Sequence, residues 1–264
     1  MNKSYKINEE QLTFFNLNGY LVIKDVIDFK EIQEYRSMYD SFLDGTINTG
    51  KNRSDLGIGL GSNKGIENIT QIMWPSDFVP ELPGMQYHQR ILSLAKSLLG
   101  QDIEMDFDML INKAPHTNTP TPWHQDAAYW ISMPDKRAVS CWLALDKATL
   151  NNGCMWYIPG SHLKPLRPHK SIGGKGGALT CEATEEEGIY VEIEPGSCVL
   201  HHGGTLHYSR GNTTDGKRRA FIINYRPKSM IELERSMGFD HGKSGNAAER
   251  KVRNEETKDK SNIL

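Results

Sequence analysis

The alternation of apolar and polar residues in the first part of the chain predicts two helices around one strand. Asn8 and Gln11 have the spacing of a capping box, so a short helix is expected to begin there and to end at Gly19. The β-branched run 20–26 predicts a strand. An N-cap at Asp28 predicts a second helix directly after it.

Two segments separate this region from the rest of the chain. Residues 45–70 are rich in glycine and predict a long loop, which in a compact domain is usually functional or mobile. Residues 86–99 carry their apolar side chains largely on one helical face, and Gly100 follows at a position typical of a helix end. A third helix is therefore expected before residue 101.

The pattern changes after residue 101 to short β-rich runs separated by Pro, Gly, Asn and Asp. The predicted strands are 102–112, 121–126, 137–145, 154–158, 189–193, 197–202, 205–209 and 218–226. About eight such strands predict a mainly β fold with helical elaborations, in the form of a sandwich, a jelly roll or a cupin-like barrel.

The 264 residues suit one large domain with a single core. We place this domain at residues 1–243, with a helix-and-strand part at 1–101 and a jelly-roll core at 102–229. Residues 244–264 are rich in charged and polar side chains, and we expect them to form a disordered tail.

Charge and composition exclude several classes of partner. Lys and Arg number 31 against 33 Asp and Glu, and the net charge of -2 predicts binding neither to nucleic acid nor to an anionic membrane surface. The four cysteines form no C-x-x-C pair, which argues against a zinc knuckle or a redox dithiol. Without an apolar signal-peptide core or a membrane span, we expect a cytoplasmic protein. The sequence leaves the oligomeric state open.

A candidate metal site begins at His124 and Asp126. On a strand, residues two apart point to the same face, so this imidazole and this carboxylate converge. An isolated His-x-Asp pair is more often a surface hydrogen bond, but Trp123, Tyr129 and Trp130 supply apolar walls here. A second histidine would complete the 2-His-1-carboxylate triad that is typical of non-haem iron(II) oxygenases.

His207 is the preferred third ligand. Glycines on both sides predict a very short strand that carries its side chain into the mouth of the barrel. His201 and His202 are rivals, and spacing alone does not exclude either of them. The residues that follow His207 favour it.

Those residues predict a binding group for a dicarboxylate. If residues 211–216 form a hairpin loop, Ser209 lies opposite Arg218 on the face of His207, and Arg219 points to the other face. A buried arginine beside the metal offers the fixed fork of donors that the far end of a dicarboxylate co-substrate needs.

The motifs together resemble those of the phytanoyl-CoA dioxygenase family of Fe(II)/2-oxoglutarate-dependent oxygenases. The resemblance is carried by several segments in a set order: Phe15-Asn-Leu-Asn-Gly-Tyr-Leu-Val-Ile-Lys-Asp-Val, Trp123-His-Gln-Asp, Asn152-Gly-Cys, Ile158-Pro-Gly-Ser-His, His207-x-Ser-x-x-Asn and Arg218. Each segment alone is weak, whereas the order and spacing of all of them are specific.

The resemblance implies roles for individual residues. His124, Asp126 and His207 would hold Fe(II) as the catalytic centre. Arg218 would bind the distal carboxylate of 2-oxoglutarate, assisted by Ser209. The co-substrates would be 2-oxoglutarate and O2.

Further implications concern the fold and the reaction. The family fold is a double-stranded β-helix, a jelly-roll relative of the cupins, with N-terminal helices packed on one sheet. Trp142 matches an aromatic residue that lines the co-substrate pocket, although a tryptophan in an alternating strand also suits plain core. Asp126 favours hydroxylation or a related oxidation of a small organic metabolite, with release of succinate and CO2, over halogenation.

Four residues are candidates for the substrate pocket: Tyr129, Trp130, His116 and Arg167. Arg167 belongs to the basic start of the loop 163–188, which either closes over an anionic substrate group or is simply solvated. His116 lies in a loop before the first metal-binding strand, where a solvated histidine is the commoner case.

Two other functions fit the same residues. One is a cupin-type metalloenzyme that does not use 2-oxoglutarate, and the other is a non-catalytic β-sandwich binding module. A requirement for the charge of Arg218 separates the first from the oxygenase, and stoichiometric Fe(II) binding separates the second. The sequence does not identify the substrate or the loop that acts as a lid.

Overall fold

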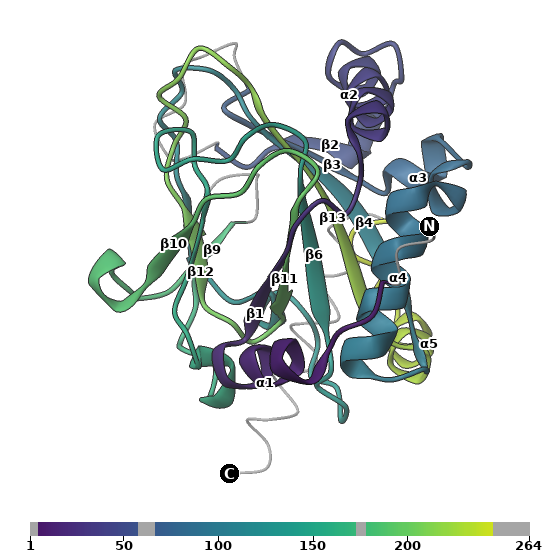
Figure 1. Cartoon of the computed structure of the whole chain (residues 1–264), viewed down its shortest axis with the longest axis vertical. Coiled ribbons are helices and arrows are strands. Elements are labelled where there is room, and N and C mark those ends of the chain that lie inside the picture. The colour runs from purple at the N-terminus through teal and green to yellow at the C-terminus, as the bar shows by residue number, and fades with distance from the viewer. Residues whose placement is uncertain (1–4, 58–66, 173–177, 245–264) are drawn as a thin grey trace.

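The computed structural model describes residues 5–57, 67–172 and 178–244. Two antiparallel sheets face each other, and α2, α3, α4 and α5 lie on the outer side of the larger sheet (Figure 1). This arrangement confirms the predicted jelly roll with helices on one sheet. None of the helices in the described ranges is long and apolar enough to cross a bilayer.

The larger sheet has seven strands. In spatial order they are β1 (Tyr20–Ile23), β11 (Cys198–His202), β6 (Val139–Ala144), β13 (Arg218–Pro227), β4 (Ile103–Lys113), β3 (Ile69–Met73) and β2 (Arg53–Asp55). The smaller sheet has four strands, β10 (Ile189–Val191), β7 (Met155–Tyr157), β12 (His207–Ser209) and β5 (Thr121–His124). A separate pair is formed by β8 (Lys170–Ser171) and β9 (Leu179–Thr180).

The helices are α1 (Glu9–Asn18), α2 (Phe29–Leu43), α3 (Pro75–Phe78), α4 (Gln86–Leu99) and α5 (Lys228–Ser236). The predicted capping box at Asn8 is present, and the N-cap at Asp28 also forms one. Gly19 ends α1 with φ of +78°, a backbone conformation that glycine adopts without strain. Local sequence therefore defines both N-terminal helices.

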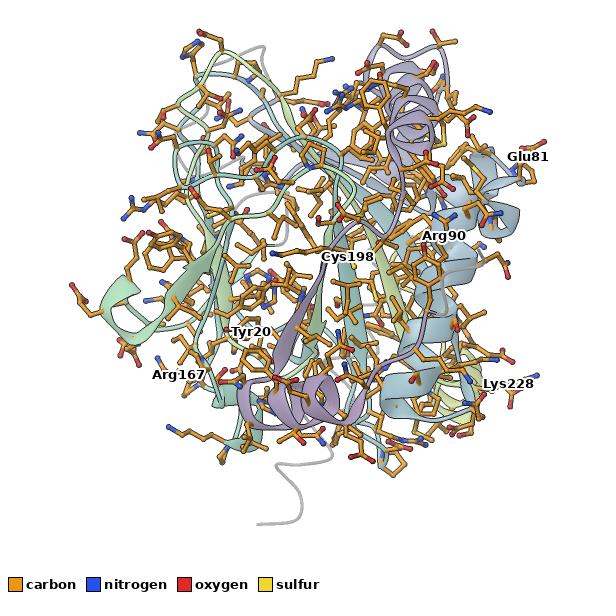
Figure 2. All side chains as sticks on the ribbon, in the orientation of Figure 1. Tyr20, Glu81, Arg90, Arg167, Cys198 and Lys228 are labelled. Atoms are coloured by element: carbon orange, nitrogen blue, oxygen red, sulfur yellow. The ribbon has the colours of Figure 1, made fainter. Side chains whose placement is uncertain are left out.

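The strands of the larger sheet divide their side chains between two cores. In β13, Ala220 and Ile222 point between the sheets and pack near Trp142, whereas Phe221 and Ile223 point outward against α2 and α4. Figure 2 shows Cys198 on β11 near the middle of the molecule and Arg167 at the periphery, on the side of the smaller sheet. The space between the sheets is where the candidate site forms.

All eight β runs predicted after residue 101 correspond to strands, but four other strands were missed, of which β8 and β9 lie in the predicted loop 163–188. β2 lies within the predicted loop 45–70 and β3 begins at its end. Both were missed because their pairing depends on β4, which lies farther along the chain. The strand predicted at 20–26 ends at Ile23. β1, β2 and β3 bring three strands of segment 1–101 into the larger sheet.

The single domain at residues 1–243 stays a prediction. The predicted tail 244–264 falls, apart from its first residue, outside the described residues.

Candidate active site

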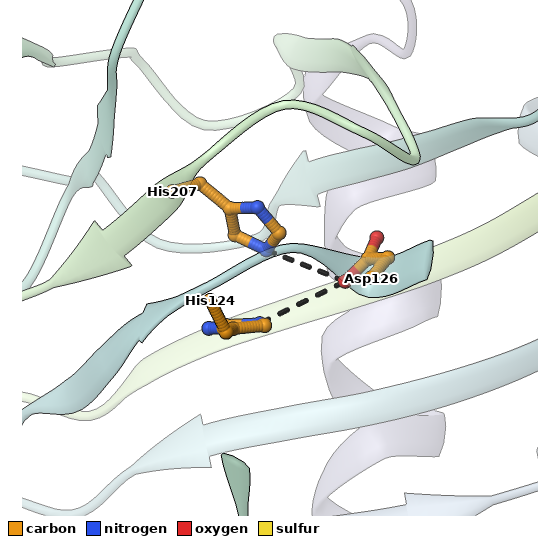
Figure 3. A group of neighbouring side chains, drawn as sticks. All are labelled: His124, Asp126 and His207. Carbon is orange, nitrogen blue, oxygen red and sulfur yellow. Dashed lines mark ion pairs between the residues drawn. The ribbon is translucent and has the colours of Figure 1, made fainter. Parts of the chain in front are cut away.

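His124, Asp126 and His207 converge between the two sheets (Figure 3). Nε2 of His207 lies 3.4 Å from Oδ1 of Asp126, and Nε2 of His124 lies 3.7 Å from the same oxygen. The histidines are direct partners across β5 and β12. Asp126 begins a 3-10 turn after the strand instead of lying within it as expected, yet its carboxylate still points toward both imidazoles.

Both imidazoles are held in one tautomer by the backbone. Nδ1 of His124 donates to the carbonyl of Pro122 at 2.7 Å, and Nδ1 of His207 donates to the carbonyl of Thr205 at 2.9 Å. Nε2 is therefore the nitrogen of each ring that faces Asp126. A backbone acceptor on the far nitrogen is the usual way in which metal-binding histidines are oriented.

The second oxygen of Asp126 is fixed by other side chains. Ser140 donates to Oδ2 at 2.6 Å, and Nε2 of His201 lies 3.2 Å from the same atom. Asn224 donates to the Ser140 hydroxyl at 2.9 Å, and the hydroxyl of Tyr157 lies 3.3 Å from Nδ1 of His201. These contacts leave Oδ1 as the oxygen that faces the histidines.

The two rival histidines have other positions. His201 lies behind the carboxylate of Asp126 instead of beside His124. Nδ1 of His202 accepts from the backbone N–H of Gly204 at 3.0 Å, and its ring packs near His162. Of the three histidines considered from the sequence, only His207 shares one oxygen of Asp126 with His124.

The electrostatics of the cluster favour an ionised carboxylate. Burial opposes the ionisation of Asp126, but His207 and His201 outweigh it and hold the pKa of that carboxyl well below its ordinary value. Burial and the neighbouring His207 lower the pKa of His124 to about 3. A neutral imidazole and a carboxylate are the forms that bind a divalent metal.

Arg218 is buried at the start of β13 and has no counter-ion among the described residues. Its side chain is 1% exposed, its guanidinium lies over the ring of Trp142 at 5.1 Å, and Nε and Nη1 have no acceptor among the described residues. Burial lowers the pKa of Arg218 to about 10, so the guanidinium stays charged near neutral pH. Such a group needs an anion, and its donors suit a carboxylate.

The predicted hairpin between Ser209 and Arg218 is wrong. β12 pairs with β5 and β7 in the smaller sheet, whereas β13 pairs with β4 and β6 in the larger one. Ser209 and Arg218 therefore lie on facing sheets instead of side by side. The predicted outward direction of Arg219 is confirmed, because its guanidinium pairs with Asp146 at 2.8 Å and with Asp40 at 3.0 Å.

Two of the candidate substrate residues lie near the cluster. The ring of Tyr129 meets that of His124 edge-on, with centroids 5.7 Å apart. The backbone N–H of Arg167 donates to Oε1 of Gln125 at 2.9 Å, while its guanidinium pairs with Glu187. The start of the loop 163–188 is thus attached to the segment between His124 and Asp126.

The other two candidates lie elsewhere. Trp130 packs over the guanidinium of Arg226 at 4.4 Å, and His116 pairs with Asp215 at 2.8 Å in an exposed position. Trp123, expected as an apolar wall, belongs to a separate cluster with residues of β7 and β12. The described contacts do not join these three side chains to the metal-binding group.

Sequence reasoning missed several polar residues of this interior. Ser140 and Asn224 are buried among apolar residues of their strands, Lys113 is buried at the end of β4, and His201 was considered only as a ligand. A signal was present, because a serine within Val-Ser-Cys-Trp-Leu-Ala and an asparagine within Phe-Ile-Ile-Asn-Tyr interrupt strands of apolar residues. Buried polar groups of this kind require partners.

Comparisons with known proteins agree with this geometry. A family model described as phytanoyl-CoA dioxygenase (PhyH) matches residues 15–220. A probable phytanoyl-CoA dioxygenase of Caenorhabditis elegans is 29% identical over 237 residues, which are 83% of this chain and 75% of that protein. The peroxisomal phytanoyl-CoA dioxygenase of Homo sapiens is 26% identical over 227 residues, which are 82% of this chain and 67% of that protein.

A solved structure gives the same result. EvdO2 from Micromonospora carbonacea var. aurantiaca, crystallised with 2-oxoglutarate, matches with a TM-score of 0.71 at 27% identity, covering 85% of this chain and 93% of that one. The fold and site thus define an Fe(II)- and 2-oxoglutarate-dependent dioxygenase, which also uses O2. The chain belongs to the phytanoyl-CoA dioxygenase family.

Proposed function

We propose that His124, Asp126 and His207 hold the Fe(II) of this dioxygenase. Two observations support this assignment. Nε2 of each histidine faces the same oxygen of Asp126, and the other polar atom of each of the three side chains is hydrogen-bonded within the protein. Bound there, the metal would supply activation of O2 and oxidative decarboxylation of 2-oxoglutarate. The protein's own part is to orient the ligands and to exclude water.

The single observation that carries the co-substrate assignment is the unpaired guanidinium of Arg218. The distal carboxylate of 2-oxoglutarate would take up its free Nε and Nη1 donors, which otherwise remain buried without partners. Trp142 packs against the same guanidinium and limits its position. Ser209 lies on β12 in the facing sheet, two residues after His207, and is assigned a supporting role.

The reaction that we propose is hydroxylation, or a related oxidation, of a small organic metabolite, with release of succinate and CO2. Tyr129 beside His124 and the loop that begins near Arg167 are the proposed substrate contacts, while Trp130 and His116 have weaker support from their positions. Nucleic acid and membranes are not part of the proposal, and the location that we propose is cytoplasmic.

The test is succinate formation from 2-oxoglutarate by protein loaded with Fe(II) without oxygen and then exposed to O2. A panel of small carboxylates, amines and acyl thioesters would be added one at a time. Succinate formation stimulated by one compound class and lost in Asp126→Ala supports the proposal. Stoichiometric Fe(II) binding without 2-oxoglutarate binding or turnover supports a cupin-type metalloenzyme instead.

The binding-module alternative predicts a different result. In that case the protein takes up no stoichiometric Fe(II), or it still takes up Fe(II) after His124 and Asp126 are both replaced by Ala. The unpaired donors of Arg218 favour the oxygenase over both alternatives, because only the oxygenase requires a dicarboxylate co-substrate at this position.

A further inference from the structure

Lys113 is a second buried cation next to Arg218. It is the last residue of β4, lies directly opposite Arg218 on β13, and has a side chain that is 0% exposed. Its Nζ donates to the backbone carbonyl of Thr119 at 3.0 Å and lies 3.4 Å from the carbonyl of Ser209 on the facing sheet. An ammonium group has three N–H donors, and these two carbonyls satisfy only two of them.

The fold makes room for this side chain. A Cβ added to Gly153 would lie 3.1 Å from Cδ of Lys113 and 2.4 Å from the carbonyl oxygen of Arg210. The backbone of Gly153 also has φ of +91°, which disfavours other residues. Lys113 therefore runs through a tight passage between the sheets toward the end of β12.

Neither cation has a carboxylate partner among the described residues. Asp146, which follows β6, is bound to Arg219 on the opposite face of β13. Burial and the charge of Arg218 hold the pKa of Lys113 well below its ordinary value. Two adjacent cations buried without an anion are unfavourable unless a ligand supplies the negative charge.

We infer that Lys113 is a positioning residue of the co-substrate site: it adds a second positive charge near the distal carboxylate bound by Arg218 and holds the Ser209 end of β12 against β4. This inference rests on the proposed function, because it requires 2-oxoglutarate to lie against Arg218. A purely structural lysine would need only the two backbone carbonyls. Its charge would then be irrelevant to the ligand.

The experiment measures dissociation constants of Fe(II)-loaded protein without oxygen for two ligands, 2-oxoglutarate and 2-oxobutyrate. Both ligands carry the same 2-oxo acid group, but only 2-oxoglutarate has a distal carboxylate. Lys113→Gln keeps N–H donors for the two carbonyls without a charge, and Lys113→Met keeps only the apolar stem. Lys217→Gln, at an exposed position beside Arg218, controls for the loss of one positive charge.

We expect Lys113→Gln to weaken 2-oxoglutarate binding by about tenfold or more while 2-oxobutyrate binding changes little, since a charge-assisted contact is lost for one ligand only. Lys217→Gln should change neither constant. Equal weakening for both ligands, or no change for either, overturns the inference. If Lys113→Met does not fold, the Gln variant still decides. Failure of the unmodified protein to bind 2-oxoglutarate would instead refute the proposed function.

Discussion

The hydroxyl of Ser140 donates a 2.6 Å hydrogen bond to Oδ2 of Asp126, the oxygen that faces away from the two histidines. Asn224 in turn holds the Ser140 hydroxyl, and both residues come from central strands of the larger sheet. Residues of the larger sheet therefore orient the carboxylate of Asp126 toward the two histidines of the smaller sheet. Metal-binding geometry here depends on how the two sheets pack.

Replacing Ser140 tests this orientation. Ser140→Ala should weaken Fe(II) binding by about 10- to 100-fold, the usual effect of removing a hydrogen bond that orients a ligand. Anaerobic calorimetry with Fe(II) measures the change, and Ser37→Ala on the exposed face of α2 is the matched control. Unchanged affinity in Ser140→Ala would show that the hydrogen bond does not orient a metal ligand.

Replacing His201 and His202 separates a supporting histidine from a ligand. His201→Gln should lower Fe(II) affinity by about 10-fold but leave the stoichiometry at one metal per chain, because His201 contacts Oδ2 of Asp126 and not the oxygen that faces His124 and His207. His202→Ala should leave affinity unchanged, whereas His207→Ala should abolish stoichiometric binding. Complete loss of Fe(II) binding in His201→Gln, together with retained binding in His207→Ala, would show that His201 is the ligand and His207 is not.

Arg218 and Arg219 form a natural pair of test positions on opposite faces of β13. Arg218→Ala should raise the dissociation constant for 2-oxoglutarate by about 100-fold or more, because two charge-assisted hydrogen bonds are lost, and should leave Fe(II) affinity intact. Arg219→Ala should retain 2-oxoglutarate affinity, since Arg219 pairs with Asp146 and Asp40. Anaerobic titration gives both constants, and equal effects of the two substitutions would contradict the assignment.

A second buried cluster predicts a pH-dependent contribution to stability. Nε2 of His241 lies 2.9 Å from Asp106 and 3.1 Å from Glu234, and Arg226 also pairs with Glu234. Burial would lower the pKa of His241, but Asp106 outweighs it and raises the pKa above its ordinary value. The stabilisation from protonated His241 is therefore complete below the unfolded-state pKa of about 6.5 and is lost as pH rises through the folded-state pKa.

His241→Asn tests this sign, because asparagine tolerates the local φ of +51°. The substitution should lower the free energy of unfolding by about 3–5 kcal/mol near pH 6, as expected for breaking a buried ion pair, and by less near pH 9. Urea denaturation at both pH values measures the difference. A cost that is equal at both pH values, or larger at pH 9, would argue against a protonated His241.

The sequence predicted all three converging residues and most of the strands, but only the strands and the pair His124 and Asp126 follow from local patterns. Residue spacing brings the side chains of His124 and Asp126 to one side even though a turn begins at Asp126. The choice between His201 and His207 depended on which strand faces β5, and strand pairing between sheets is not a local property. The chain also crosses from the smaller to the larger sheet between Ser209 and Arg218, so the assumed hairpin was wrong.

Other errors have the same origin. Trp130 follows the metal-binding segment closely in sequence, yet its ring packs on Arg226, which lies on a distant strand. β2 has only three residues and contains no large apolar side chain, so nothing in its composition indicates a strand before β3 is placed beside it. Contacts between residues far apart in the chain determine each of these positions.

The most direct test of the central claim is anaerobic absorption spectroscopy of the protein with Fe(II) and 2-oxoglutarate together. If His124, Asp126 and His207 hold the iron and Arg218 anchors the co-substrate beside it, a visible charge-transfer band should appear only when both are present. Asp126→Ala should abolish this band. In Arg218→Ala the band should appear only at much higher concentrations of 2-oxoglutarate. A protein that binds Fe(II) but gives no band at saturating 2-oxoglutarate would contradict the claim.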